Sequence, residues 1–352
     1  MSHARSLSFE PGRHKDVVGL KFSVKHVASL LLLLAACAHF PPAPQGSADY
    51  WGFTGPWDKR SDVSVERHGS SLAHIITGWI ALDTTSFLPV RLYHDSIGRD
   101  PALAPRAMAL ITSYNGNRFH PEIVRGLGSD AQATGITAGA IASLVDSSRY
   151  RGVVIDFEGM TPRDLDQLLA FTRAVADSVR AHGVDTVVIA VPAGDTAAYP
   201  AALLLQSADL IMPMLYDQHW SGSPPGPIAS PEWVTRDLGT RVAEVGAASI
   251  VAAFPLYGYR WRKAAETEVI SFDDARRLTT MTNTALVRDP VSATLHATSP
   301  EGWELWISDR VLLETLVREA RQLGVRRFAL WRLGLEDQAV WDFIDPQHSR
   351  GP

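Results

Sequence analysis

The chain of 352 residues contains a single cysteine, Cys37. A lone cysteine excludes an internal disulfide framework. The 12 histidines include no HExxH pattern or other paired spacing, so the sequence offers no support for a metal site. No GxSxG segment is present, which removes the commonest signature of serine hydrolases. We therefore expect neither a metal nor a cofactor.

The sequence also has no excess of positive charge. The formal net charge is −5 and no Lys/Arg patch stands out, so we expect no nucleic-acid partner. The chain is 46% hydrophobic, which suits one large α/β domain, and it lacks the glycine-rich phosphate loop of many doubly wound sheets. The 10 tryptophans are more informative, because flat aromatic faces pack well on sugar rings, although tryptophan is also a good core residue.

The N-terminal region predicts an export signal. Lys21 and Lys25 precede the apolar run VASLLLLLAA, which ends at Cys37 and is too short to predict a membrane span. The stretch LAAC (34–37) resembles a bacterial lipobox, in which the cysteine becomes lipid-modified and is the first mature residue. The alternative is an ordinary signal peptide, or an uncleaved anchor, with an incidental cysteine.

We therefore expect a signal peptide over residues 1–36, with an upstream extension, and a lipidated Cys37 followed by a proline-rich tether over 37–48. Lipid chains on Cys37 would bind the protein to a membrane. Ala38 in the next position favours the outer membrane, if the organism has one. The predicted location is the cell envelope, and the predicted oligomeric state is a monomer.

From residue 49 onward, short apolar runs alternate with helical patterns, which is typical of βα units. We predict strands at 49–53, 73–80, 108–114, 152–157, 186–191, 210–216, 249–256 and 327–331. Several are continuously apolar, as parallel strands covered on both faces are. Eight strands with intervening helices predict a (β/α)8 TIM barrel over 49–346, with a doubly wound open sheet as the main competitor.

Two helices have marked ends. Thr161 is a predicted cap for one helix, which Gly183 ends, and Ser308 is a predicted cap for another, which Gly324 ends. The interval between the seventh and eighth strands is much longer than one helix requires. Within it, a strand–helix–strand pattern predicts a small α+β insertion over about 259–306.

The strand over 152–157 ends beside two carboxylates. Residues i and i+2 of a strand share a face, so Asp156 and Glu158 point the same way at the end of the strand where barrel enzymes place catalysis. The charge on one carboxylate raises the proton affinity of the other, which can yield one acid and one anion. The alternative is a pair that caps a neighbouring helix or binds an arginine.

Four segments resemble motifs of the family 18 glycoside hydrolases, the chitinase family. GVVIDFEGM (152–160) resembles the strand-four motif DGxDxDWE, and is nearest to the IDFEG form of the N-acetylglucosaminidases that act on peptidoglycan and spore cortex. IMPMLYDQHW (211–220) resembles the strand-six motif, AAFPLYGYRW (252–261) the strand-seven segment and FALWRLGLED (328–337) the closing tryptophan strand. The segments follow the family's order over most of the mature chain.

The resemblance implies that Glu158 is the general acid. Asp156 would orient and stabilise the substrate's own acetamide, whose carbonyl attacks the anomeric carbon in place of a protein carboxylate. Tyr216 would donate a hydrogen bond to that acetamide, Asp217 would contact the sugar or Glu158, and Trp331 would form the floor of the pocket. The alternatives are ordinary packing for Tyr216 and Trp331, and a helix cap for Asp217.

Three further aromatic residues, Trp220, Tyr257 and Trp261, either line the cleft or pack in the core. The match to the family also has gaps, because Arg151 and Val154 stand where the motif has its first and middle aspartates. The middle aspartate normally shares a proton with the position of Asp156, and an apolar neighbour disfavours a charged carboxylate.

The predicted function is a glycosidase that cleaves β-linked N-acetylglucosamine glycans by substrate-assisted retaining catalysis. Peptidoglycan is favoured over chitin as the polysaccharide partner, because of the anchor and the IDFEG form of the motif. Two alternatives stay open. One is a catalytically weak or inactive glycan-binding lipoprotein on the same barrel, and the other is an envelope scaffold whose barrel binds a protein.

Overall fold

The computed structural model describes residues 49–146, 150–263 and 265–346. The predicted signal peptide, the lipidated Cys37 and the tether all lie outside the described residues. Within those ranges, no helix has the length and apolar character needed to cross a bilayer.

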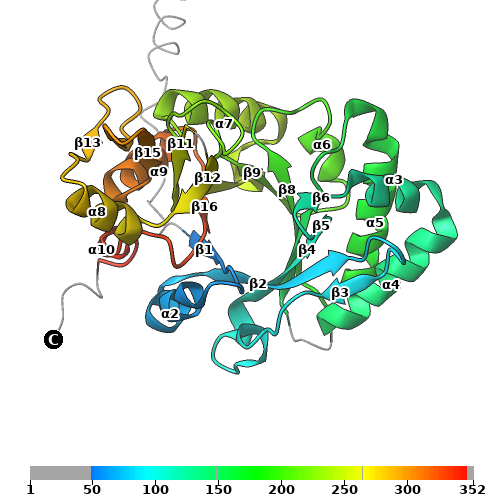
Figure 1. The fold of residues 1–352 in the computed structure, drawn as a ribbon. Coiled ribbons are helices and arrows are strands. Elements are labelled where there is room, and N and C mark those ends of the chain that lie inside the picture. Colours follow the sequence, from blue (N-terminus) through cyan, green and yellow to red (C-terminus); the bar gives the residue numbers. More distant parts are fainter. Residues whose placement is uncertain (1–48, 147–149, 264, 347–352) are drawn as a thin grey trace, which may run out of the picture. The chain divides into compact units, whose positions relative to one another are not determined.

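A closed ring of eight parallel strands forms the centre of the domain (Figure 1). In order around the ring, the strands are β1 (Asp49–Phe53), β2 (His74–Leu82), β4 (Ala107–Thr112), β7 (Gly152–Asp156), β8 (Thr186–Pro192), β9 (Leu210–Met214), β10 (Val251–Pro255) and β16 (Arg327–Trp331). The ring closes because β1 pairs in parallel with both β16 and β2. Each strand overlaps its predicted position, and the predicted TIM barrel is confirmed.

Helices surround this ring (Figure 1). They are α2 (Lys59–His68), α3 (Pro121–Ser129), α4 (Ala131–Asp146), α5 (Leu165–Ala181), α6 (Ala201–Leu204), α7 (Pro231–Val245), α9 (Arg310–Gln322) and α10 (Val340–Ile344). Short 3-10 turns cover Gly69–Ser71, Ile97–Arg99, Ala104–Arg106, Pro162–Asp164 and Ala247–Ser249. Strand β3 (Pro89–Arg91) pairs antiparallel with β2, and β5 (Tyr114–Asn115) with β6 (Arg118–Phe119).

The helix predicted after Thr161 forms as expected. It begins as a 3-10 turn and continues as α5, and Thr161 and Asp164 satisfy each other's backbone amides in a capping box. The second predicted cap is wrong by one residue, because the carboxylate of Asp309, not the hydroxyl of Ser308, accepts from the amide of Leu312 at 3.1 Å.

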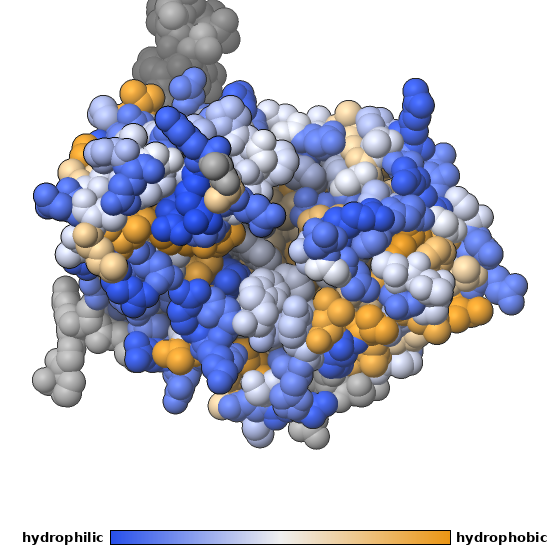
Figure 2. Space-filling view, in the orientation of Figure 1, coloured by the Kyte–Doolittle hydropathy of each residue, from blue (hydrophilic) through white to orange (hydrophobic). Residues whose placement is uncertain are grey.

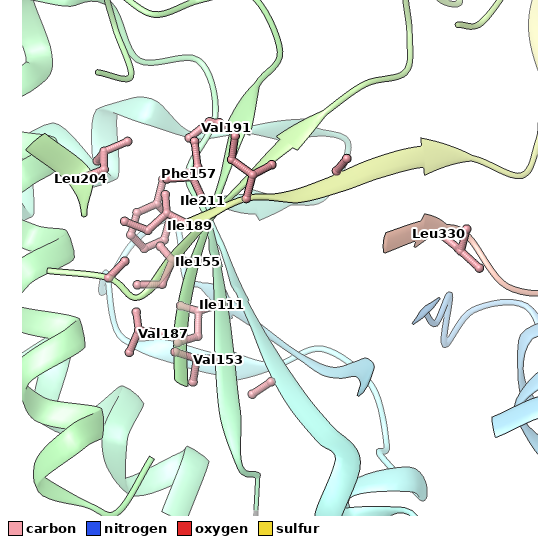
Figure 3. Close-up of a cluster of buried hydrophobic side chains, with 14 of the residues drawn as sticks. Ile111, Val153, Ile155, Phe157, Val187, Ile189, Val191, Leu204, Ile211 and Leu330 are labelled. Carbon is pink, nitrogen blue, oxygen red and sulfur yellow. The ribbon is translucent and has the colours of Figure 1, made fainter. Parts of the chain in front are cut away.

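Side chains of the barrel strands alternate between two apolar layers. On β7, Val153 and Ile155 face the surrounding helices together with the following Phe157 (Figure 3), whereas Val154 faces the barrel interior. This alternation follows from the two-residue period of a strand. The next inward positions after Val154 are Asp156 and Glu158, at the carboxyl-terminal end of the barrel.

The insertion between β10 and β16 is richer in strands than predicted. It contains β11 (Gly258–Arg262), β12 (Ala265–Ile270), α8 (Phe272–Met281), β13 (Val287–Arg288), β14 (Leu295–Thr298) and β15 (Trp303–Ile307), with the strands in the sheet order β12-β11-β15-β14-β13. The expected strand–helix–strand unit is thus a five-stranded antiparallel sheet with one helix. Three strands were thus missed. β13 has only two residues, and β11 continues the loop after β10 without a clear turn signal. The stretch expected to be the second strand forms two strands, β14 and β15.

Candidate active site

Asp156 is the last residue of β7 and is paired across the sheet with Thr112, the last residue of β4. The Thr112 hydroxyl donates to Oδ2 of Asp156 at 3.2 Å. Oδ1 is buried and has no hydrogen-bond partner among the described residues. Burial raises the pKa of Asp156 to about 7, and the Thr112 hydrogen bond opposes that rise only in part.

Glu158 lies two residues farther along, in a turn that runs from Phe157 to Met160. Gly159 in this turn has a φ of 78°, a backbone conformation that side chains with a Cβ rarely adopt. Burial raises the pKa of Glu158 well above its usual range, and the negative charges of Asp156 and Asp217 raise it further. Burial thus favours the protonated form of both carboxyl groups, and the neighbouring negative charges favour it further in Glu158.

Two stacked aromatic rings come from other strands at this end of the barrel. Tyr216 follows β9 and Trp331 ends β16, and their rings are stacked with centroids 6.1 Å apart and an interplanar angle of 15°. Burial raises the pKa of Tyr216 well above its usual range, and the charges of Glu158 and Asp156 add to this. The Tyr216 hydroxyl therefore remains protonated and available as a hydrogen-bond donor.

Asp217 does not cap a helix. Its backbone has a φ of 59°, and its Oδ1 accepts hydrogen bonds from the hydroxyls of Tyr257 and Tyr259, the latter at 3.0 Å. The next helix along the chain, α7, is capped by Ser230. Tyr257 is buried, and its hydroxyl is bound to the Asp217 carboxylate.

The two remaining predicted aromatic residues differ in exposure. Trp220, in the loop after β9, is 52% exposed. Trp261 is 7% exposed and its indole N–H donates to the carbonyl of Ser223 at 3.0 Å, so it packs in the structure. The space-filling view shows this face of the domain hollowed near its middle (Figure 2). Trp220 lies four residues after Tyr216 in the sequence.

Some residues of this region were not predicted. Trp57, in the loop after β1, is 48% exposed; it makes an edge contact with Trp79, and the guanidinium of Arg332 lies over its ring. Trp79 in turn contacts Trp331. Among the residues of the site that were not predicted, Thr112 has a recognisable signal, because it is a polar residue at the end of an otherwise apolar strand.

Metal binding finds no support in the part of the chain that the structure describes. No three histidine, cysteine, aspartate or glutamate side chains lie there in an arrangement that could hold an ion. The side chains described above supply carboxyl, phenol and indole groups at this end of the barrel.

Comparison with known proteins finds a relative of similar sequence. No family model matches the chain. The putative sporulation-specific glycosylase YdhD of Bacillus subtilis is 32% identical over 160 residues, which are 44% of this chain and 38% of that protein. This chain thus spans well under two thirds of the length of that relative.

Solved structures share the fold. A chitinase from Chromobacterium violaceum superposes with a TM-score of 0.75 at 19% identity, covering 87% of this chain and 100% of the chitinase. The spore cortex-lytic enzyme SleL of Bacillus megaterium superposes with a TM-score of 0.76 at 17% identity, covering 87% of this chain and 75% of SleL. The predicted resemblance to the family 18 glycoside hydrolases is confirmed.

The segments that carry the family 18 resemblance meet at one end of the barrel. They supply Asp156 at the end of β7 and Glu158 just beyond it, Tyr216 and Asp217 after β9, and Trp331 at the end of β16. The position of the motif's middle aspartate is occupied by Val154, which is fully buried in the barrel interior.

Proposed function

We propose that this protein is a glycoside hydrolase that cleaves β-linked N-acetylglucosamine glycans. The observation that carries the proposal is the pair of inward carboxyl groups at the end of β7. Burial raises the pKa of both, and the charges of Asp156 and Asp217 raise that of Glu158 further. A carboxyl group that stays protonated at neutral pH can donate a proton to a glycosidic oxygen.

The other residues fit a substrate-assisted retaining mechanism. In its ionised form, Asp156 would accept a hydrogen bond from the N–H of the substrate's acetamide and so orient the carbonyl that attacks the anomeric carbon. Its unpartnered Oδ1 supports this role, since a buried acceptor without a partner is costly unless a ligand supplies one. The protonated Tyr216 hydroxyl would bind the acetamide oxygen, and Trp331 would pack under the sugar ring.

We further propose peptidoglycan as the polymer, ahead of chitin. The IDFEG form of the motif supports this choice, and so do the names of similar proteins, which include a sporulation glycosylase and spore cortex-lytic enzymes. The experiment is to incubate the full chain and its Glu158→Gln variant with glycan strands of peptidoglycan and with chitin oligomers, and to measure new reducing ends. We expect only the wild type to release them, and equal values for both proteins on both substrates would refute the proposal.

A glycan-binding protein without turnover is the second candidate, and Val154 is the observation that favours it. With no carboxyl group at position 154, Asp156 cannot pass its proton inward along the strand. Binding of the same glycans by wild type and Glu158→Gln, without reducing ends from either, is the result expected of such a protein.

We also propose that Cys37 carries a lipid that holds the protein in the cell envelope. The support is the LAAC stretch after the apolar run in the sequence. Growth with an alkyne-tagged fatty acid should label the wild type and leave Cys37→Ser unlabelled. Equal labelling of the two proteins would rule out this anchor.

A further inference from the structure

The turn that carries Glu158 is held at both ends by one tyrosine. Tyr199 lies in the loop between β8 and α6 and is 1% exposed. Its hydroxyl donates to the carbonyl oxygen of Phe157 at 2.8 Å and accepts from the amide of Met160 at 3.1 Å. These two backbone groups flank Glu158 and Gly159, so the Tyr199 hydroxyl binds the backbone on both sides of Glu158.

The Glu158 carboxyl group itself has no hydrogen bond to any other described residue. Its position therefore depends on the backbone that carries it, and the backbone of this turn depends on Tyr199. General acid catalysis is sensitive to this placement, because a displacement of about 1 Å can cost roughly a hundredfold in rate.

Arg241 in turn holds the loop that carries Tyr199. This arginine of α7 is fully buried, and its guanidinium donates to the carbonyl oxygens of Pro192 (2.8 Å), Ala193 (3.0 Å), Asp195 (3.0 Å) and Tyr199 (2.8 Å). It is also paired with Glu244 on the same helix. Only a planar guanidinium has enough donors in a fixed arrangement to bind four carbonyls at once.

We propose that Tyr199 is a positioning residue for the general acid Glu158, and that Arg241 positions Tyr199. Contacts thus run from helix α7 through the loop after β8 to the acid after β7, and the acid is fixed by the neighbouring βα unit as well as by its own strand. The catalytic part of this inference rests on the proposed glycosidase function, and the structural part does not.

The first test compares Tyr199→Phe with Tyr50→Phe in the full chain. Both changes remove a buried phenolic hydroxyl and keep the ring, but the Tyr50 hydroxyl has no partner in the described part of the chain. On the glycan that the wild type cleaves, we expect kcat of Tyr199→Phe to fall roughly 10- to 100-fold with KM changed less than about threefold. Tyr50→Phe should keep the kcat of the wild type.

A leaving-group comparison separates positioning from general damage. A dinitrophenyl glycoside of the same sugar releases a stable anion that needs little help from an acid. If Tyr199 positions the proton donor, the deficit of Tyr199→Phe on this substrate should shrink to less than about threefold. An equal deficit on both substrates, or no deficit on either, would overturn the proposal.

Hydrogen exchange tests whether Tyr199 holds the turn from Phe157 to Met160, and it does not rely on activity. Exchange of the Met160 amide should be faster in Tyr199→Phe than in the wild type and unchanged in Tyr50→Phe, with strands far from the turn unaffected. Unchanged exchange at Met160 would overturn the claim that Tyr199 holds this turn. The exchange measurement is informative even if the wild type cleaves no glycan. In that case the proposed function fails, and the exchange rate of Met160 still shows whether Tyr199 holds the turn.

Arg241→Lys provides a second variant if Tyr199→Phe does not fold. A single ammonium group cannot bind all four carbonyls, so exchange at Met160 should rise, as in Tyr199→Phe. If the Met160 amide of Arg241→Lys exchanges at the rate of the wild type, Arg241 does not position Tyr199.

Discussion

Thr112 of β4 and Asp156 of β7 face each other across adjacent strands, and the hydroxyl of Thr112 donates to Oδ2 of Asp156 at 3.2 Å. Thr112 also accepts from the amide of Tyr114 at 3.0 Å, which fixes the direction of its side chain. Because Val154 offers Asp156 no polar partner, Thr112 is the side chain through which the described structure stabilises the ionised form of Asp156.

The first prediction concerns Thr112→Val. Loss of the hydrogen bond should raise the pKa of Asp156, because that bond favours the charged form. A bond worth about 0.5–1.5 kcal/mol corresponds to roughly 0.4–1.1 pH units, so the acidic limb of kcat/KM should move upward by that amount. Thr172→Val is the matched control, since Thr172 is a buried threonine of α5 whose hydroxyl has no partner in the described ranges. Equal profiles for wild type and Thr112→Val would contradict the prediction.

The second prediction is the pH profile of the wild type. Substrate assistance requires an ionised Asp156 and a protonated Glu158. As the pH rises through about 7, Asp156 loses its proton and kcat/KM should increase. At higher pH, Glu158 loses its proton and kcat/KM should fall. The apparent pKa values of the two limbs belong to the pair of carboxyl groups, since the charge on each affects the other. An acidic limb near pH 4 would show that burial does not raise the pKa of Asp156.

The barrel was predictable because its signals are local and repeated. Each strand is a short apolar run, and the carboxylates Asp156 and Glu158 follow one run at a spacing of two, so their common face is a consequence of strand geometry. The cap at Thr161 and the helix ends at glycine are equally local signals. The cap predicted at Ser308 is off by one residue because α9 begins at Arg310, which places Asp309 at the cap position.

The supports of the site were not predictable in the same way. Tyr199 lies about forty residues after Glu158 in the chain, and Arg241 about forty residues farther. Their contacts are to backbone atoms of loops, which leave no complementary residue in the sequence. Tyr257 was expected in the cleft or the core, and only the turn at Asp217, with its positive φ, brings the Asp217 carboxylate to it.

The third prediction concerns stability in Asp156→Asn. In the folded protein burial raises the pKa of Asp156 to about 7, from an ordinary value of 3.8. Between these values the unfolded chain loses the proton and the folded protein keeps it, so the wild type loses stability as the pH rises from about 4 to 7. Asp156→Asn has no such loss. The difference in free energy of unfolding, variant minus wild type, should grow by on the order of 2–4 kcal/mol over that range. Urea unfolding at several pH values measures it, and a difference that is constant with pH would refute the prediction.

The fourth prediction concerns exposed Trp220 and buried Trp261. Trp220→Ala should raise KM for long glycans several-fold with little change in the melting temperature, because its side chain is half exposed and free to stack on a sugar. Trp261→Ala should instead lower stability by about 3–5 kcal/mol, the usual cost of truncating a large buried aromatic side chain. If Trp220→Ala leaves KM unchanged on every glycan length tested, Trp220 is no part of the binding surface.

The last prediction restores the carboxyl group that the motif of family 18 has at position 154. Val154→Asp places a carboxyl group in the apolar barrel interior, two residues before Asp156 on the same face. We expect it to be protonated and to cost about 2–4 kcal/mol of stability, as burial of a polar group in a core does. A protonated group there can donate a hydrogen bond to Asp156, whose Oδ1 has no partner among the described residues, and so favour its ionised form.

The acidic limb of kcat/KM should therefore move to lower pH in Val154→Asp. Val154→Asn is the matched control. The asparagine side chain has nearly the same shape as aspartate, and its burial should cost a similar amount of stability, but it cannot exchange a proton with Asp156. Its amide can still donate a hydrogen bond, so a shift seen equally in both variants would assign the effect to hydrogen bonding alone. A higher kcat in Val154→Asp than in Val154→Asn would show that proton exchange along β7 contributes to turnover, and an acidic limb that moves upward in Val154→Asp would contradict the prediction.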